Sequence, residues 1–283
     1  MRAYGRVAAG VATLAAVIAM PGVATAATVL SSGQWVNPYG RQPTITDYTV
    51  TTTRPYWSAM VMRPGYYFGS DTDHLPKYQM QLLDSTGAPP TSSTLEDYLP
   101  NFVAVDGNVR PAQSYTARVI KLQDDDASEQ YGLTFVDGGI VAPVGTSTIQ
   151  RPASGQRNDV YLRDVWVPAN QSVTITVGGV GETCPDAIGT LYLHAYLLAS
   201  DPADPSSTMQ GAQSALVQSD HVFQNGADCA VRITAITTRA AWYGVLIFSP
   251  GFAALSVNVR EIPWPPVLPT RPASPHSSSP PAG

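Results

Sequence analysis

The chain has 283 residues, a formal net charge of −5 and only 13% charged residues. This balance, 16 basic against 21 acidic side chains, argues against nucleic acid as a partner, because phosphate binding needs clustered Lys and Arg. The length exceeds the roughly 100–150 residues of a typical single domain, so we expect two domains.

The N-terminal residues predict a secretory signal peptide over residues 1–26. Arg2 and Arg6 precede an apolar run from Val7 to Met20, and Ala24-Thr25-Ala26 follows. These are the marks of a leader, and the run is shorter than the roughly 20 apolar residues of a membrane span. A short amphipathic helix is the alternative, but the run has no polar face. We therefore expect cleavage after Ala26, no membrane span in the mature chain, and secretion, from a bacterium to judge by the Ala-rich leader.

Strand-like runs rich in Val, Ile, Thr, Tyr and Trp fill the chain after residue 27. Gly, Pro, Asn and Asp separate them at spacings of about 8–12 residues, which is typical of sandwiches and barrels. The expected strands are 44–53, 56–62, 77–83, 115–122, 160–167, 172–177, 190–198, 230–236, 241–248 and 254–259. The fold class we predict is all-β, with two tandem antiparallel β-sandwiches of jelly-roll type after the signal peptide.

Composition shifts predict the domain boundaries. The first sandwich spans 27–142 and the second spans 159–262, with a linker over 143–158 that is rich in Pro, Ser, Thr and Gly. The segment 263–283 is Pro/Ser-rich and cannot bury a core, so we expect a disordered or polyproline tail there.

The two halves also resemble one another. Each begins with a Trp-containing strand and a Pro turn, around Trp57 and Trp166, and each ends with a strand led by aromatic residues. We interpret this order as a tandem duplication. A single larger sandwich with chance similarity is the alternative.

A Pro-Gly turn followed by a strand of the Leu-Tyr-Leu type, here Leu191-Tyr192-Leu193, resembles the bacterial pre-peptidase C-terminal type of β-sandwich. In that family an acidic pair usually stands directly before this strand. Here Asp71 and Asp73 lie well before Tyr78, and no acidic pair precedes Leu191. The resemblance implies a sandwich architecture and an accessory module attached to exported enzymes.

Cys184 and Cys229 are the only cysteines. An even pair in an exported protein predicts a disulfide. A reactive thiol pair or a metal site is the alternative, but the spacing lacks the CxxC form and two ligands do not complete a zinc site.

The sequence carries no catalytic signature. The G-x-S-x-G and H-E-x-x-H patterns do not occur, and His221 beside Asp220 is the best candidate general base. Sequence neighbours in a strand point to opposite faces, so this pair is a weak signal. The sequence favours a protein that is not an enzyme. An exported hydrolase with a site assembled from distant residues, or an accessory module acting on an exported enzyme, is the alternative.

One acidic cluster is a candidate metal site, formed by Asp124, Asp125, Asp126 and Glu129. Oxygen-rich loops suit Ca²⁺, which takes 6–8 oxygen ligands. The cluster does not match the D-x-[DN]-x-[DN]-G spacing, and a solvated turn is the alternative. We predict no other cofactor.

Three tyrosines in predicted loops or at strand ends, Tyr66, Tyr67 and Tyr131, are candidate ligand contacts, because exposed aromatic rings stack on sugars and anchor protein partners. Trp57, Trp166 and Trp242 are expected in the cores. The function we predict is a secreted, non-catalytic binding or cell-envelope-associated protein, with a glycan or an envelope protein as partner. The sequence does not predict the ligand or the oligomeric state.

Overall fold

The computed structural model describes residues 27–37, 43–52, 56–64, 78–84, 91–95, 101–106, 114–122, 131–151, 159–184, 193–199, 209–210, 217–218, 222–249 and 251–263. The regular structure in these segments consists of β-strands, and none of them contains a helix that could cross a membrane. The strands are β1 (Thr28–Val29), β2 (Trp35–Val36), β3 (Ile45–Thr51), β4 (Trp57–Pro64), β5 (Tyr78–Leu83), β6 (Thr91–Leu95), β7 (Asn101–Asp106), β8 (Ser114–Lys121), β9 (Tyr131–Asp137), β10 (Gly145–Gln150), β11 (Asp159–Val167), β12 (Gln171–Gly179), β13 (His194–Leu198), β14 (Met209–Gln210), β15 (Val217–Gln218), β16 (Phe223–Asn225), β17 (Asp228–Thr237), β18 (Ala241–Ser249) and β19 (Ala254–Pro263).

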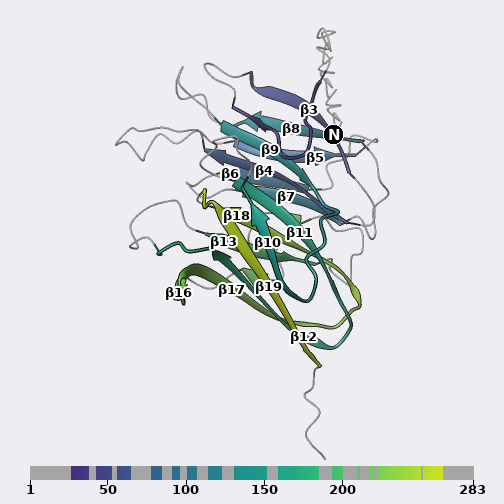
Figure 1. Ribbon diagram of the computed structural model, residues 1–283. Coiled ribbons are helices and arrows are strands. Elements are labelled where there is room, and N and C mark those ends of the chain that lie inside the picture. Colours follow the sequence, from purple (N-terminus) through teal and green to yellow (C-terminus); the bar gives the residue numbers. More distant parts are fainter. Residues whose placement is uncertain are drawn as a thin grey trace, which may run out of the picture.

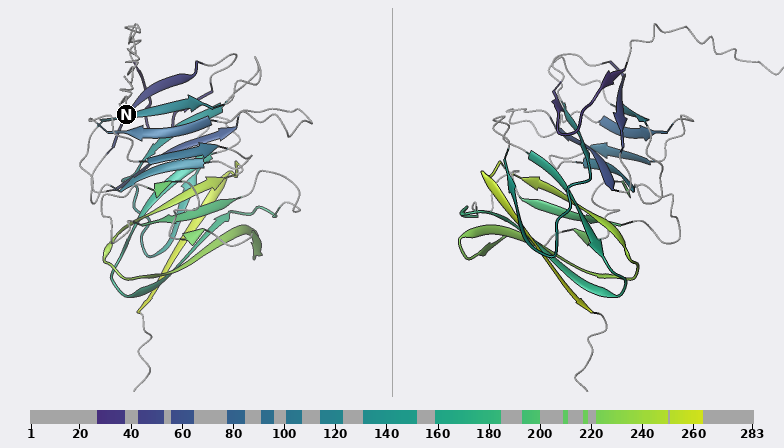
Figure 2. Two further views of the ribbon diagram at one scale, coloured as in Figure 1. Left: turned by 180° about the vertical axis from the view of Figure 1, so that it is seen from behind. Right: turned by 45° about the vertical axis from the view of Figure 1, so that its right-hand side comes forward.

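These strands form four sheets, which we call A to D. Sheet A has the strand order β1-β3-β8-β5-β6, and sheet B has β14-β7-β4-β9-β2. Sheet C has the order β11-β18-β13-β15, and sheet D has β10-β19-β12-β17-β16. Neighbouring strands are antiparallel except for β1, which pairs with β3 in parallel. Figures 1 and 2 show the sheets stacked as two sandwiches, one above the other.

The outer sheets follow the period of two that a half-buried strand requires. In β8 of sheet A the buried and more accessible residues alternate along the whole strand, and in β17 of sheet D the same alternation runs from Val231 to Thr237. Because successive side chains of a strand point to opposite faces, one face of each outer sheet is buried and the other faces outward.

Each sandwich has its own core. Side chains from sheets A and B, among them Tyr78, Met80 and Leu133, form one buried cluster. Side chains from sheets C and D, among them Ile175 and Val245, form another. The two tandem antiparallel sandwiches predicted from the sequence are therefore present.

A third core lies between the sandwiches. Sheets B and C pack face to face, with Phe102 of β7 tilted against Tyr196 of β13 and Phe248 of β18 at ring centroid distances of 5.2 and 6.3 Å. Trp57, Leu198 and Leu246 are fully buried in the same cluster. Burial on both faces explains why β4 and β18 read as nearly continuous apolar runs.

The structure differs from the predicted boundaries at two places. Residues 145–150, expected within a linker, form β10, which pairs antiparallel with β19 at the edge of sheet D. The strand has the sequence GTSTIQ, in which Ile149 is the one buried residue, and so polar a composition suits an edge strand as well as a linker. In addition, β14 from the second half of the chain pairs with β7 of sheet B, so the predicted second sandwich also contributes to the first.

Candidate binding surface

Three aromatic side chains lie together where the interface between sheets B and C reaches the surface. Trp242 of β18 contacts Trp166 of β11 edge to face at a centroid distance of 5.5 Å. It contacts Tyr56 in the same way at 5.2 Å. Trp166 is 46% exposed, and Tyr56 and Trp242 are partly exposed. We call these three residues the aromatic rim.

Strand register brings the rim together. Trp166 and Trp242 are directly paired in the β11–β18 ladder, so their side chains leave the same face of sheet C. On β11 that face also carries Leu162, which is buried against sheet B. Trp166 lies on the same face nearer the end of the strand, where the third core meets the surface and its ring is exposed.

The buried Trp57 fixes the position of Trp242. Its indole Nε1–H donates a hydrogen bond of 2.9 Å to the Trp242 carbonyl oxygen. A Cβ at Gly244 would lie 2.8 Å from Cγ of Trp57, so glycine is needed there for this close packing. Strand pairing and the buried Trp57 indole therefore fix the backbone from which the Trp166 and Trp242 rings project.

Asp164 joins the two sandwiches directly beneath the rim. Its side chain is fully buried. Oδ1 accepts a hydrogen bond of 3.0 Å from the Trp57 backbone N–H, and Oδ2 accepts one of 2.7 Å from the Gly139 backbone N–H. The Asp164 carboxylate thus binds two segments of the first sandwich. One carries Tyr56, and the other, at Gly139, lies beside the Tyr56 ring.

The connection between the sandwiches follows the same strand. The backbone N–H of Asp164 donates to the Ile140 carbonyl at 3.0 Å, and its carbonyl accepts from the Ala142 N–H at 2.9 Å. Val141 forms a parallel bridge with Asp164. The segment therefore covers the free edge of β11, a common protection of sheet edges.

Burial raises the pKa of Asp164 from 3.8 to about 6. The hydrogen bonds from Gly139 and Trp57 lower this pKa, while the nearby charge of Asp137 raises it and that of Arg163 lowers it. Perturbed carboxylates occur at catalytic sites, but this one has no access to solvent. Its surroundings suit a structural role at the junction.

The predicted disulfide is confirmed. Cys184 and Cys229 are bonded, with their Cα atoms 4.6 Å apart. The bridge joins the segment after β12 to the start of β17. Beside it, the Cys184 N–H donates to Gln224 Oε1 at 3.1 Å and the Gly181 N–H to Asp228 Oδ1 at 2.8 Å.

The prediction that Tyr131 is a surface contact is wrong. Tyr131 begins β9, is 1% exposed and packs edge to face against Tyr78. Its hydroxyl and that of Tyr48 share a hydrogen bond of 2.9 Å, which satisfies both buried groups. Tyr66 and Tyr67 lie outside the described residues.

The acidic residues of the predicted Ca²⁺ site, Asp124, Asp125, Asp126 and Glu129, also lie outside the described residues, as does His221. Within the described part of the chain, no three His, Cys, Asp or Glu side chains are grouped so that they could hold a metal ion. His194 starts β13, where burial lowers its pKa.

The sequence does not predict the rim, since its pattern favours Trp166 and Trp242 in the cores. Both lie close to a turn, Trp166 just before Pro168 and Trp242 just after Arg239. A tryptophan near the end of a strand can extend past the margin of the facing sheet and so be exposed. The position of both residues beside a turn is therefore the feature of the sequence that indicates the rim.

Comparisons with known proteins assign no family. No family model matches the chain, and no curated protein matches it. Among solved structures, tripeptidyl peptidase 2 aligns with 79% of this chain at 12% identity and a TM-score of 0.26, and the chain spans 24% of that protein. The CUB1-EGF-CUB2 region of human MASP-1/3 aligns with 80% of this chain and 99% of its own length at 8% identity and a TM-score of 0.22. Neither likeness supports an argument about function.

Proposed function

We propose that this chain is an exported, non-catalytic binding protein that contacts a carbohydrate through the aromatic rim of Tyr56, Trp166 and Trp242. The observation that carries the proposal is the exposure of Trp166 in a ring cluster held by strands. Rigid aromatic side chains provide a large contact area at little cost in conformational entropy. Exposed rings of this kind stack on the apolar faces of sugars.

Three features support this proposal. The disulfide between Cys184 and Cys229 is typical of a protein that folds outside the cytoplasm. The three rings of the rim carry no charge, which suits a neutral ligand. The perturbed carboxylate near the rim, Asp164, is sealed from solvent and cannot act on a bound molecule. The resemblance to accessory sandwiches of exported enzymes is compatible with the same role.

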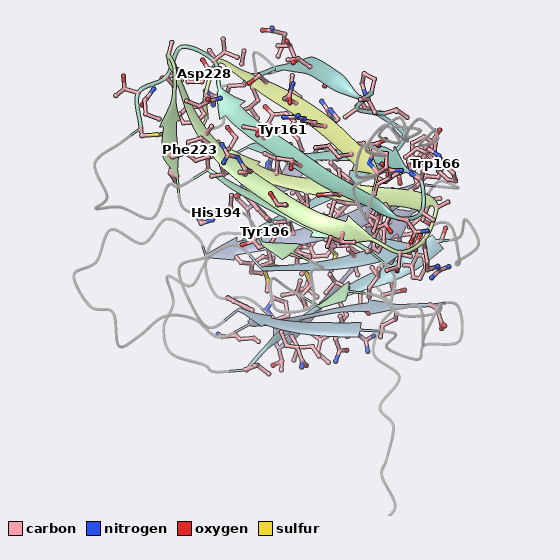
Figure 3. All side chains as sticks on the ribbon, turned by 90° about the horizontal axis from the view of Figure 1, so that it is seen from below. Tyr161, Trp166, His194, Tyr196, Phe223 and Asp228 are labelled. Carbon is pink, nitrogen blue, oxygen red and sulfur yellow. A yellow bond between two sulfur atoms is a disulfide. The ribbon has the colours of Figure 1, made fainter. Side chains whose placement is uncertain are left out.

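Affinity gel electrophoresis against a panel of neutral soluble polysaccharides tests the proposal. We expect at least one polysaccharide to retard the wild-type protein, and Trp166→Ala to weaken that retardation by about tenfold in Kd, since a central aromatic contact contributes more than about 1 kcal/mol. Phe223→Ala is the matched control. Figure 3 shows Phe223 at the opposite end of the second sandwich from Trp166.

Two results would contradict the proposal. One is migration of the wild-type protein unaffected by every polysaccharide of the panel. The other is an equal loss of retardation in Trp166→Ala and Phe223→Ala, because that would place the contact elsewhere or reflect general destabilisation.

A further inference from the structure

The C-terminal segment contains a regular proline pattern that the strands do not use. Prolines stand at positions 263, 266, 269, 272 and 275, one every three residues. A polyproline II helix has three residues per turn, so these five prolines would line one edge of such a helix. The pattern predicts a polyproline II ridge that begins at the last residue of β19.

This ridge begins at the same end of the strands of the second sandwich as the aromatic rim. Pro263 is paired with Gln171 of β12, and Gln171 is paired on its other side with Thr237 of β17. The turn before Gln171 connects β12 with Trp166 at the end of β11, and the turn after Thr237 connects β17 with Trp242 at the start of β18. Figure 1 shows β19 ending beside β12 at the foot of the second sandwich.

The segment is long enough to reach the rim. Trp166 precedes Gln171 by only five residues, so their Cα atoms lie at most about 18 Å apart at about 3.6 Å per residue. Residues 264–275 would extend about 37 Å as a polyproline II helix at about 3.1 Å per residue. The paired strands at Gln171 and Pro263 add roughly 5 Å, so Trp166 lies at most about 23 Å from the start of the segment, and the extended segment is about 1.6 times as long as this distance.

The proline-rich segment and the aromatic rim are also chemically complementary. Proline-rich segments bind in grooves lined by aromatic side chains, where pyrrolidine rings pack against Trp and Tyr faces. The rim offers two Trp and one Tyr ring in fixed edge-to-face contacts. Val267 and Leu268 add apolar area between two of the ridge prolines.

We propose that the chain's own segment from Pro263 to Pro275 docks on the aromatic rim as a polyproline II helix and competes there with an outside ligand. The inference rests on the rim as a binding surface, as proposed above, and not on which carbohydrate it binds. A short tether gives an effective concentration in the millimolar range, so even a weak contact would be largely formed.

Fluorine NMR of the full exported chain labelled with 5-fluorotryptophan tests this contact. The chain has five Trp residues, and single Trp→Phe variants assign their signals. We expect Pro266→Ala combined with Pro269→Ala to shift the signals of Trp166 and Trp242 and to leave that of Trp35 unchanged. The same variant should bind the polysaccharide about fivefold more tightly.

The matched control is Pro265→Ala with Pro280→Ala, which removes two prolines outside the three-residue repeat. The ridge is refuted if the rim signals do not move in the first variant, or if they move equally in the control. Shifts that depend on protein concentration would contradict docking within one chain and assign the contact to a second copy. If the signals move as expected but Trp166→Ala leaves the Kd for the polysaccharide unchanged, the docking of the segment is supported and the proposed carbohydrate function is refuted.

Discussion

Asp164 is the residue that links both sandwiches to the rim. Its carboxylate is fully buried and accepts hydrogen bonds from two backbone N–H groups of the first sandwich. The titration of such a buried acid makes the free energy of unfolding depend on pH. Because its pKa is raised in the folded state, the folded protein binds this proton more tightly than the unfolded chain does, so this group makes folding less favourable as pH rises.

The pKa of about 6, against an ordinary value of 3.8, sets the pH window. Between about pH 4 and pH 7 the Asp164 contribution to the free energy of unfolding should fall by about 2 kcal/mol as pH rises. Asp164→Asn removes the titration. Urea unfolding at both pH values tests this: the wild type should lose stability relative to Asp164→Asn as pH increases, and parallel pH profiles would contradict the assignment.

Gly138 is the second residue on which the junction depends. A Cβ at this position would overlap the backbone carbonyl oxygen of Trp57 and lie 2.6 Å from Oδ2 of Asp164, and both residues are fully buried. Gly138→Ala should therefore destabilise the protein by about 2–4 kcal/mol in urea unfolding, because buried neighbours have little room to move. Gly33→Ala is the control. It changes a glycine at a φ of 78° with open space around it, so only a backbone cost of about 1 kcal/mol is expected. Equal losses would argue against the steric role.

At the scale of elements, the disulfide closes a loop of 45 residues that contains β13 and β14. These two strands belong to different sheets, C and B. Constraint of so long a loop in the unfolded chain stabilises the fold by up to about 4 kcal/mol.

Cys184→Ser with Cys229→Ser should lower the free energy of unfolding by about 2–4 kcal/mol, measured by urea titration. The same titration of reduced wild-type protein should agree with the double variant. An unchanged midpoint in both would show that the bridge does not constrain the unfolded chain.

The sequence predicted individual strands well where composition and alternation agree. The strand expected at 44–53 is β3, and those expected at 172–177 and 254–259 lie within β12 and β19. It did not predict β9, because Tyr131 directly follows an acidic run of a kind typical of solvated loops. The edge strand β10 was missed because Thr, Ser and Gly occur in linkers as often as in solvated strands.

The packing of sheet B on sheet C was not predicted, although a signal existed. Strands buried on both faces lose their alternation, as the run from Tyr243 to Ser249 in β18 does. The sequence cannot say which other strands cover the second face, since that depends on contacts between distant segments. The rim lies at the margin of this interface, so its position was not predictable either.

At the scale of the whole molecule, three cores in series make one body of four stacked sheets (Figure 2). The third core and Asp164 fix how the sandwiches face one another. Tyr56 comes from the first sandwich, and Trp166 and Trp242 come from the second. The rim therefore exists only when both sandwiches are folded and docked.

The most direct test of the rim as the contact surface is a titration of the 5-fluorotryptophan-labelled protein with an oligosaccharide taken from the polysaccharide that retards it. The account predicts that the Trp166 and Trp242 signals shift and saturate together, while that of Trp35 stays in place. Saturable shifts confined to other tryptophans, with Trp166 and Trp242 unmoved, would contradict it.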